Sequence, residues 1–158
     1  GAGHLPRYVR DLTDDPAGDV YTDGGLFPQS LIKIRDIRDG TSHTLAVGEK
    51  TYHMGNFIWI NGMHWLISLD DHMYVNACKN VRWPINGDRD VYGYYKFDPK
   101  RPAGATDMYL NDIIFGSNHS GGANFSYADG SVHFLQDSMD FTVYQSMATR
   151  NGGEVLKP

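Results

Sequence analysis

The segment Phe115-Gly-Ser-Asn-His-Ser-Gly-Gly-Ala-Asn-Phe-Ser-Tyr-Ala-Asp-Gly-Ser-Val-His-Phe134 decides which fold the sequence predicts. Its Asp129-Gly130 dipeptide is typical of a two-residue type I′ turn, because both central positions of that turn need a positive φ. The residues on either side of the dipeptide alternate between apolar and polar, which is the period of a half-buried strand. The segment therefore predicts a β-hairpin.

The two-residue turn also predicts the register of the hairpin. Pairing outward from the turn places Tyr127 opposite Val132 and Phe125 opposite Phe134. In that register the apolar residues share one face, which we expect to be buried. The members of the two faces are Phe125, Tyr127, Val132 and Phe134 on the apolar side, and Asn124, Ser126, Ser131 and His133 on the polar side.

Composition sets the fold class. An aromatic content of 13% and 18 glycines in 158 residues favour a sheet-rich and loop-rich body over a helical bundle, since aromatic side chains pack well on pleated surfaces and glycines serve turns. The length fits a single domain, residues 1–158. We therefore predict an α+β domain with a predominantly antiparallel β-sheet.

Charge, cysteine content and hydropathy argue against several classes of protein. The formal net charge is −5 and the sequence has no basic cluster, which argues against a nucleic-acid partner, because binding to phosphates requires cationic charge. The single cysteine, Cys78, cannot form an internal disulfide. No stretch approaches the roughly 20 apolar residues of a membrane-spanning helix.

Further elements follow from local patterns. Leu31 to Ile34 alternates as a short strand or extended segment, and Leu45 to Val47 predicts a strand that ends at Gly48-Glu49. The aromatic stretch 54–69 predicts a second hairpin that turns at Asn61-Gly62. Residues 69–112 are polar and rich in Pro and Gly, so we expect a loop-rich insert in which partner recognition resides.

A short helix is predicted after the signature hairpin. Ser138 or Asp140 can cap its N-terminus, and Phe141, Tyr144 and Met147 fall on one helical face that would pack on the sheet. Asn151-Gly152 would close the helix as a C-cap.

Three segments of the chain resemble a large bacterial family, abundant in planctomycetes, whose members carry an H-X9-DG motif and a prepilin-type N-terminus. The first segment is Ile37-Arg-Asp-Gly-Thr-Ser-His-Thr-Leu-Ala-Val-Gly-Glu49, in which His43 stands where the family usually has Asn. The second segment runs from Asn118 to Phe134 and contains His119, then Asp129-Gly130 after nine residues. The third segment, Thr149 to Glu154, resembles the C-terminal tail of the family. The resemblance points to domain of unknown function 1559.

The resemblance implies a pilin-like or pseudopilin-like head at the cell envelope, on its periplasmic or extracellular face. Family members usually begin with a basic stretch and a long apolar helix. Gly1 to Pro6 contains no apolar run, so membrane attachment is expected only through an N-terminal helix that these residues do not include. The motif residues, with structural or functional roles, are Asp39, Gly40, Thr41, Ser42, Thr44, Glu49, His119, Gly121, Gly122, Asn124, Asp129 and Gly130.

His119 allows two interpretations. It can be a metal ligand or acid/base group, or a structural residue whose ring bonds the backbone of the Gly121-Gly122 bend. Six strand residues separate that bend from Asp129, which is roughly 20 Å in an extended chain. His119 and Asp129 are therefore predicted at opposite ends of the hairpin, with Asp129 serving the turn, and the structural interpretation is favoured.

Calcium is the one metal that the sequence suggests. Asn86, Asp88 and Asp90 place oxygen ligands at alternate positions, as a calcium loop does, but the EF-hand continuation fails because Val91 replaces the required Gly. We expect no cofactor, with calcium as the alternative. Zinc is disfavoured, because the seven histidines show no zinc-binding spacing and no cysteine pair exists.

No catalytic signature is present. The sequence has no G-x-S-x-G elbow, and Gly121-Gly122 precedes a strand instead of a helix N-terminus that could hold phosphate. We therefore predict a non-catalytic structural or interaction subunit of the envelope, which binds protein partners or assembles with itself. The alternative is an extracellular glycan- or calcium-binding module with a stacking surface formed by Trp59, Trp65 and Trp83; core packing is the competing role for these tryptophans.

Overall fold

The computed structural model describes residues 6–8, 18, 20–27, 30–51, 63–66, 72–75 and 79–153. Short strands and a few short helices build a mixed α+β fold, in which all but one of the described strand pairs are antiparallel. The predicted fold class is confirmed. No helix among the described residues has the length and apolar character that crossing a bilayer requires.

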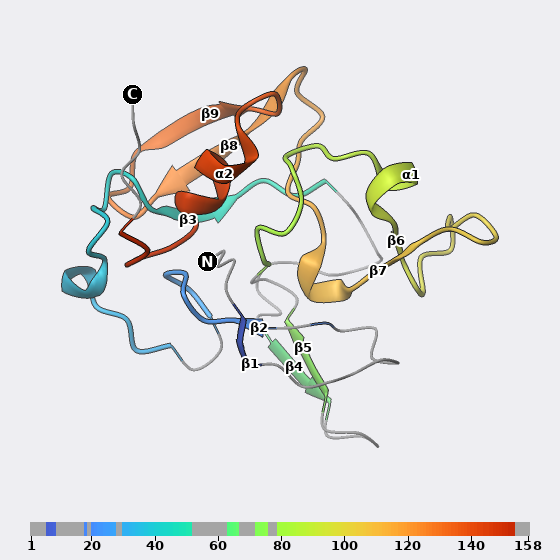
Figure 1. The fold of residues 1–158 in the computed structure, drawn as a ribbon, viewed down its shortest axis with the longest axis horizontal. Helices are drawn as coiled ribbons and strands as arrows, with labels where there is room; N and C mark the ends of the chain where they lie inside the picture. The colour runs from blue at the N-terminus through green and yellow to red at the C-terminus, as the bar shows by residue number, and fades with distance from the viewer. Residues whose placement is uncertain are drawn as a thin grey trace.

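The main sheet has three antiparallel strands in the order β3-β8-β9. β3 spans Leu45–Gly48, β8 spans Gly122–Tyr127 and β9 spans Val132–Gln136. β8 lies between the other two strands, so β3 and β9 form the two edges of this sheet (Figure 1). The predicted strand at Leu45 to Val47 and the predicted hairpin are both confirmed.

Smaller sheets and helices complete the element order. The two-stranded pairs are β1 (Pro6–Tyr8) with β2 (Val20–Tyr21), β4 (Met63–Leu66) with β5 (His72–Val75), and the parallel pair β6 (Tyr94–Tyr95) with β7 (Asp107–Met108). The helices are the 3-10 turns η1 (Ile34–Asp36) and η3 (Leu110–Asp112) and the α-helices α1 (Arg89–Tyr92) and α2 (Phe141–Ser146).

The register of the hairpin differs from the prediction by one residue. Ser126 pairs with Val132, and Phe125 pairs with His133. The loop holds three residues instead of two: the Tyr127 N–H donates to the Ser131 carbonyl at 2.8 Å, which leaves residues 128–130 outside the ladder. The glycine of the loop, Gly130, has φ +88° and takes the left-handed position that closes a three-residue hairpin.

The one-residue shift moves alternate side chains of β9 to the opposite face of the sheet. Val132 is 64% exposed and Phe134 is 46% exposed, whereas Leu135 is buried. The expected burial of Val132 and Phe134 with Phe125 and Tyr127 is therefore wrong. Side chains alternate along a strand, so a single extra loop residue is sufficient to exchange the two faces.

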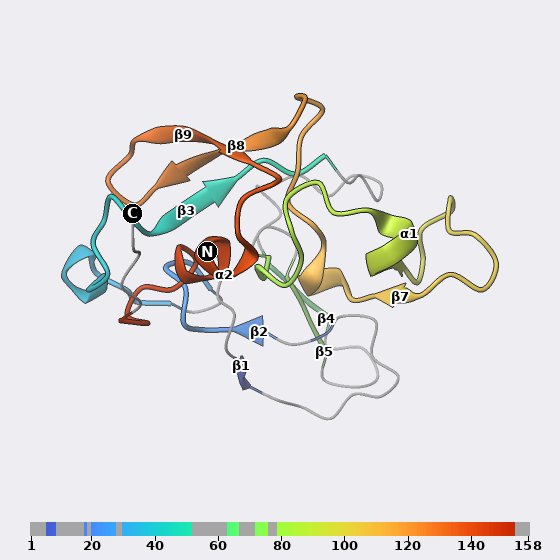
Figure 2. The same ribbon diagram turned by 45° about the horizontal axis from the view of Figure 1, so that its top comes forward.

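The main core lies between the inner face of this sheet, helix α2 and the segment around Val81 and Ile85. Tyr144 of α2 is almost fully buried and meets the Phe125 ring edge-on at a centroid distance of 5.7 Å. In Figure 2, α2 lies on the side of β3 that faces away from β9. The buried members of this cluster are Leu45, Val81, Ile85, Ala123, Phe125, Tyr127, Leu135, Tyr144 and Ala148.

Helix α2 begins where the sequence predicts and ends earlier. The Asp140 carboxylate accepts the Val143 N–H at 3.1 Å, so Asp140, one of the two expected residues, is the N-cap. The C-cap is Met147, so the prediction that Asn151-Gly152 closes the helix is wrong. The chain beyond Met147 turns back because residues 149–153 bind the loop that precedes β3.

Residues 79–114 contribute to the core more than a loop-rich insert would. A second apolar cluster forms within this stretch, and Trp83 and Tyr92 pack against it. The centroids of these two rings are 5.1 Å apart. The buried members of the cluster are Tyr95, Met108, Leu110, Ile113 and Ile114. The insert therefore contributes to a small apolar core. Its Pro and Gly content predicted loops and did not indicate this core.

Two further predictions concern local elements. Residues 31–34 do not form a strand: residues 31–33 have no regular secondary structure, and Ile34 starts the 3-10 turn η1. Lys33 has the extended backbone of the other predicted form, and its N–H donates to the Asp36 carboxylate at 2.9 Å. The predicted hairpin turn at Asn61-Gly62 and the strand before it lie outside the described residues. Its second arm coincides with β4, which pairs with β5 further along the chain.

Candidate functional site

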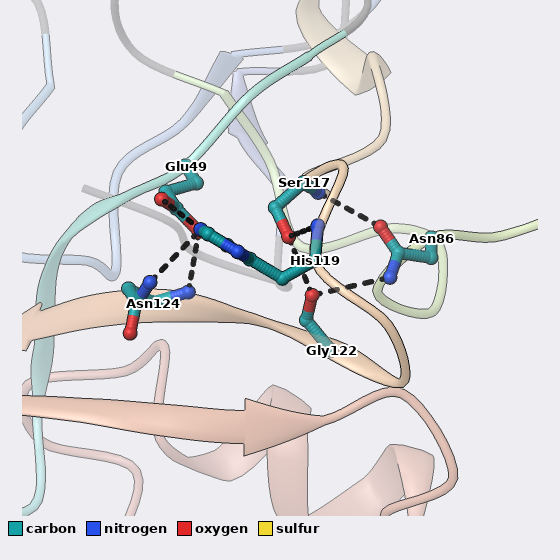
Figure 3. Close-up of polar contacts among 6 residues, drawn as sticks. All are labelled: Glu49, Asn86, Ser117, His119, Gly122 and Asn124. Carbon is teal, nitrogen blue, oxygen red and sulfur yellow. Dashed lines mark hydrogen bonds and ion pairs between the residues drawn. The ribbon is translucent and has the colours of Figure 1, made fainter.

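The first cluster of motif residues joins the end of β3 to the beginning of β8. Glu49, directly after β3, accepts the backbone N–H of Asn124 at 2.7 Å through Oε2, and the Asn124 side-chain amide at 3.3 Å. Its other oxygen, Oε1, lies 3.6 Å from Nε2 of His119 (Figure 3). The structure thus brings together Glu49 of the first segment with His119 and Asn124 of the second.

The backbone holds Glu49 in this position independently of its side chain. The Glu49 N–H donates to the Asn124 carbonyl at 3.1 Å, and the Gly116 N–H donates to the Glu49 carbonyl at 2.9 Å. The carboxylate is therefore placed between two parts of the hairpin by hydrogen bonds on both sides of its own residue.

Hydrogen bonding lowers the pKa of the Glu49 carboxyl below its ordinary value. The largest cause is the N–H of Asn124, which donates to the charged form; partial burial opposes it, and the Asn124 amide and the nearby His119 ring add to the lowering. Glu49 consequently stays a carboxylate across the neutral range, as an acceptor for donors on β8.

His119 does not make the contact that the structural interpretation predicts. Its ring faces Glu49 instead of the backbone of the Gly121-Gly122 bend, and it meets the Phe134 ring edge-on at 6.4 Å. The side chain is 60% exposed. His119 therefore lies at the rim of the cluster, in contact with solvent.

Asn86 extends the cluster to the insert. Its Oδ1 accepts the Ser117 N–H at 2.8 Å, and its Nδ2 donates at 3.3 Å to the Gly122 carbonyl (Figure 3). The Ser117 hydroxyl donates to the same carbonyl at 2.6 Å and accepts the His119 N–H at 3.0 Å. Asn86 has φ +55°, a left-handed conformation that asparagine tolerates better than most residues. The insert is thereby tied to the bend before β8.

Gly122 allows the close approach on which these bonds depend. A Cβ at this position would lie 2.0 Å from the Leu135 carbonyl oxygen, which belongs to the backbone of β9. No side chain fits there without separating the two strands. Gly121 precedes it with φ +79° and open space around it.

Asp129 lies at the other end of β8 and serves the turn. Its Oδ1 accepts the Ser131 N–H at 2.9 Å and the Ser131 hydroxyl at 2.7 Å. These bonds lower the pKa of the Asp129 carboxyl. The whole of β8 separates Asp129 from His119, and the two residues belong to different clusters.

A second cluster surrounds the loop before β3. The Asp39 carboxylate accepts the N–H of Gly152 at 2.7 Å and of Gly153 at 3.0 Å, and the Thr149 hydroxyl at 3.3 Å. The Arg150 carbonyl accepts the N–H groups of residues 38 and 39 in return, at 2.7 and 3.2 Å. The first and third segments are therefore bound to each other.

The tip of the hairpin docks on the same loop. The Thr41 carbonyl accepts the Asp129 N–H at 3.1 Å, and the Thr44 carbonyl accepts the Ala128 N–H at 2.8 Å. The buried Thr44 hydroxyl donates to the Gly40 carbonyl at 3.1 Å, and Gly40 itself has φ +96°. Ser42 is exposed, and its hydroxyl lies 3.3 Å from Nδ1 of His43. All three segments meet at this loop.

Arg150 is a site residue whose role the sequence did not reveal. Its guanidinium donates to the carbonyls of Thr22 and, at 2.8 Å, Gly24, and it lies over the Phe27 ring at 5.5 Å. Its backbone N–H donates to the Asp23 carbonyl at 3.0 Å. The third segment thereby binds residues 22–27 on one side and the loop at Asp39 on the other.

A buried polar network inside the insert was also missed. Lys79 is buried, and its Nζ donates to the Leu110 carbonyl at 2.8 Å. Asn80 donates to the buried Asp112 carboxylate at 2.7 Å, which also lies 3.7 Å from the Arg82 guanidinium. The one signal in the sequence for the burial of these polar side chains is their position next to apolar residues such as Val81.

The three residues proposed for calcium have separate roles. Asn86 binds Ser117 as described above, Asp88 caps α1 by accepting the Asp90 N–H at 2.9 Å, and Asp90 accepts the Tyr94 hydroxyl at 2.8 Å. Within the described parts of the chain, no group of three His, Cys, Asp or Glu side chains is arranged to hold a metal ion. The calcium hypothesis gains no support from this geometry.

A polar pocket of about 450 Å³ opens beside the first cluster. Asn86 and Ser117 of the cluster line it, together with three charged residues of the insert. Those charged residues are Arg89, Asp98 and Lys100. The pocket can admit a small polar molecule. Trp83, which is half-buried against the second core, does not line it; the side chains of Trp59 and Trp65, like Cys78, lie outside the described residues.

Comparison with known proteins gives one match. No curated protein and no solved structure matches the chain. A family model described as a protein of unknown function, DUF1559, matches residues 4–142, which includes both clusters except for the third segment. The match covers most of the 158 residues, and the chain therefore belongs to the DUF1559 family.

Proposed function

We propose that this domain is a non-catalytic structural subunit of the cell envelope, a pilin-like or pseudopilin-like head that binds protein partners on the periplasmic or extracellular face. The observation that carries the proposal is the use of the motif residues inside the fold. Asp39 binds the tail, Glu49 binds β8, and Asp129 holds the hairpin turn. Polar groups that hold separate segments together serve a scaffold.

The distribution of these ties supports a head that resists deformation. The loop at Asp39 joins the hairpin tip to the C-terminal segment, and Glu49 joins β3 to β8. Hydrogen bonds to charged groups contribute about 1.5–3 kcal/mol each when they are shielded from water. A subunit of an envelope assembly transmits load between neighbours, and ties across segments suit that task. Membrane attachment would come from an apolar N-terminal helix of the kind that the resemblance implies.

The location is tested in the cell that produces the protein. Antibodies to the folded domain, surface biotinylation of intact cells and fractionation of the envelope would place the full-length protein. Labelling from outside, with recovery in the envelope fraction, agrees with the proposal. Recovery with cytosolic markers and no surface labelling contradicts it.

The pocket beside Asn86 favours a second candidate, an extracellular module that binds a glycan, and calcium is the other ligand that the sequence suggests for such a module. Arg89, Asp98 and Lys100 in its lining offer both signs of charge to a polar ligand. Calcium is tested by thermal unfolding after chelation with and without the added ion, since a ligand of the folded state raises the unfolding midpoint.

Glycans are tested on an oligosaccharide array. Lys100→Ala is the pocket variant, and Lys96→Ala is its control, because Lys96 is exposed and does not line the pocket. Binding that Lys100→Ala abolishes would support this candidate, and no binding by the parent protein would dismiss it.

A further inference from the structure

Strand β9 forms an outer edge of the main sheet. Its neighbour on one side is β8, and no described element pairs with its other side. Both views show β9 at the periphery of the molecule, with β8 and then β3 on its inner side (Figures 1 and 2).

The backbone of β9 presents its free hydrogen-bonding groups at two adjacent outward positions. The bonds from Tyr127 N–H to the Ser131 carbonyl and from Asp137 N–H to the Gly121 carbonyl fix which residues face β8. In an antiparallel ladder the bonded residues alternate, so His133 and Leu135 point their N–H and C=O groups at β8. Val132 and Phe134 consequently point theirs away from β8, and these groups have no partner among the described residues.

The sequence of β9 lacks the devices that protect sheet edges. Its residues, Val-His-Phe-Leu-Gln, include no proline, lysine, arginine or carboxylate. The opposite edge differs: β3 has a register irregularity between Leu45 and Val47, and the Leu45 N–H donates to the Met147 carbonyl at 2.8 Å. Of the two edges, β9 is the one open to another strand.

We propose that β9 pairs with β9 of a second copy of this chain, antiparallel and about a two-fold axis at His133. This register is the one that places the outward groups of Val132 opposite those of Phe134 in the second copy, and the reverse. Both pairs then exchange N–H to C=O bonds, and the two sheets become one. An axis at Val132 would place Val132 opposite its own copy and leave Phe134 opposite a residue outside β9. An axis at Phe134 would place Val132 opposite Gln136, whose carbonyl already accepts the Met139 N–H at 3.2 Å.

Side chains fit the same register. Val132 and Phe134 lie on the outer face of the sheet, 64% and 46% exposed, and each would meet the other type across the axis. Pairs of an aromatic and a β-branched residue are favourable neighbours between strands. No Lys, Arg, Asp or Glu of β9 would meet its own copy across the axis, because the strand contains none. A strand with this sequence is complementary to itself.

The inference rests on the proposed function in that it names a second copy of the chain as a protein partner. Its test is made on purified protein and does not depend on location. A monomer–dimer equilibrium in solution would support the pairing even if the protein were found elsewhere in the cell.

Sedimentation velocity over a concentration series is the first experiment. We expect the average mass to rise from one copy toward two, and Phe134→Lys to weaken association about tenfold or more by placing a charge at the edge. Val47→Lys is the matched control, because Val47 is an exposed apolar residue, at 62%, on the opposite edge strand, β3. A chain that remains monomeric up to about 1 mM overturns the proposal, as does equal weakening by both variants.

Cysteine cross-linking tests the register without relying on Phe134. In a Cys78→Ser background, His133→Cys would place the two thiols opposite each other at a Cα separation of about 4.5 Å, within reach of a disulfide. Gln136→Cys is the control, because its two copies would lie roughly 20 Å apart. Rapid formation of a covalent dimer by His133→Cys alone supports the register. Equal rates for the two variants, or a faster rate for Gln136→Cys, overturns it.

Discussion

The Glu49 carboxylate accepts the backbone N–H of Asn124 at 2.7 Å, and so binds the residue after β3 to the centre of β8. The bond lies beside the β3–β8 ladder, and it depends on the charge of Glu49. A substitution of Glu49 therefore measures how much this one hydrogen bond contributes to the stability of the sheet.

Glu49→Ala is expected to lower the free energy of unfolding by about 1–2 kcal/mol, since it removes a charged acceptor and leaves the N–H of Asn124 without one. The pKa of the Glu49 carboxyl is lower in the folded chain than its ordinary value of 4.5. A lowered carboxyl pKa stabilises above the unfolded value, and this stability is lost as the pH falls through the folded value. Urea unfolding from pH 7 to pH 3 should show the variant and the parent converging at the acid end. A constant difference at every pH would contradict the role of the charge.

His119→Ala is expected to cost about 0.5 kcal/mol or less. Its side chain is 60% exposed and lies 3.6 Å from the Glu49 carboxylate, and exposed ion pairs contribute little. The comparison is a double-mutant cycle with Glu49→Ala, measured by urea unfolding. A coupling above about 1 kcal/mol would show that His119 is a principal tie instead of a rim residue.

Asp39→Ala is expected to release the C-terminal segment from the loop before β3. The carboxylate accepts the N–H groups of Gly152 and Gly153 and the Thr149 hydroxyl, so a loss of about 2 kcal/mol and faster proteolysis after Arg150 should follow. Limited trypsin digestion followed by mass spectrometry measures the release. The control is Asp36→Ala, whose hydrogen bond to Lys33 N–H is exposed and local. Unchanged cleavage in Asp39→Ala would mean that backbone bonds alone hold the tail.

Tyr144→Phe should leave stability unchanged or raise it slightly, because the Tyr144 hydroxyl is buried without a hydrogen-bond partner among the described residues. Tyr144→Ala should cost about 3–5 kcal/mol through the cavity beside Phe125. Burial raises the pKa of the Tyr144 hydroxyl, so the folded state holds its proton where the unfolded chain releases it. This contribution to stability is present below the unfolded pKa of about 10 and declines above it. Thermal unfolding of both variants at pH 8 and pH 11 checks the prediction, and a clear loss in Tyr144→Phe at pH 8 would point to a hidden partner.

Gly122→Ala should destabilise the hairpin by more than 2 kcal/mol or prevent folding, because its Cβ would lie 2.0 Å from the Leu135 carbonyl oxygen. Gly25→Ala is the control, since a Cβ there meets nothing within 4 Å. Circular dichroism melts of the two variants should differ widely. Similar midpoints would show that β8 and β9 separate at little cost.

The hairpin shows how far local sequence determines this structure. The Asp129-Gly130 dipeptide and the alternating flanks predict two strands and a turn between them, and both strands are present. The turn type depends on more than the dipeptide. The N–H groups of Ala128 and Asp129 bond the carbonyls of Thr44 and Thr41, and these long-range bonds accompany the three-residue loop. The side chain of Asp129 completes it by accepting two bonds from Ser131.

The candidate site was predictable as a set of residues and not as a set of contacts. Resemblance marked Asp39, Glu49 and His119 one by one, without indicating their partners. Glu49 meets Asn124 at a separation of 75 residues, and Asp39 meets Gly152 at 113. Spacing along a chain carries no information about such distances, because the fold of the residues between them decides which ends meet.

What the sequence by itself determined was local: the α+β class from composition and alternation, the start of α2 at one of two candidate caps, Ser138 or Asp140, and the position of the hairpin turn. These depend on the periodicity of side chains and on backbone preferences of neighbouring residues, which are readable in short windows. The tertiary structure alone decided the register of β9, the exposure of Val132 and Phe134, and the meeting of the three segments around the loop at Asp39. The reason is energetic: turn alternatives differ by little in free energy locally, and long-range hydrogen bonds select among them.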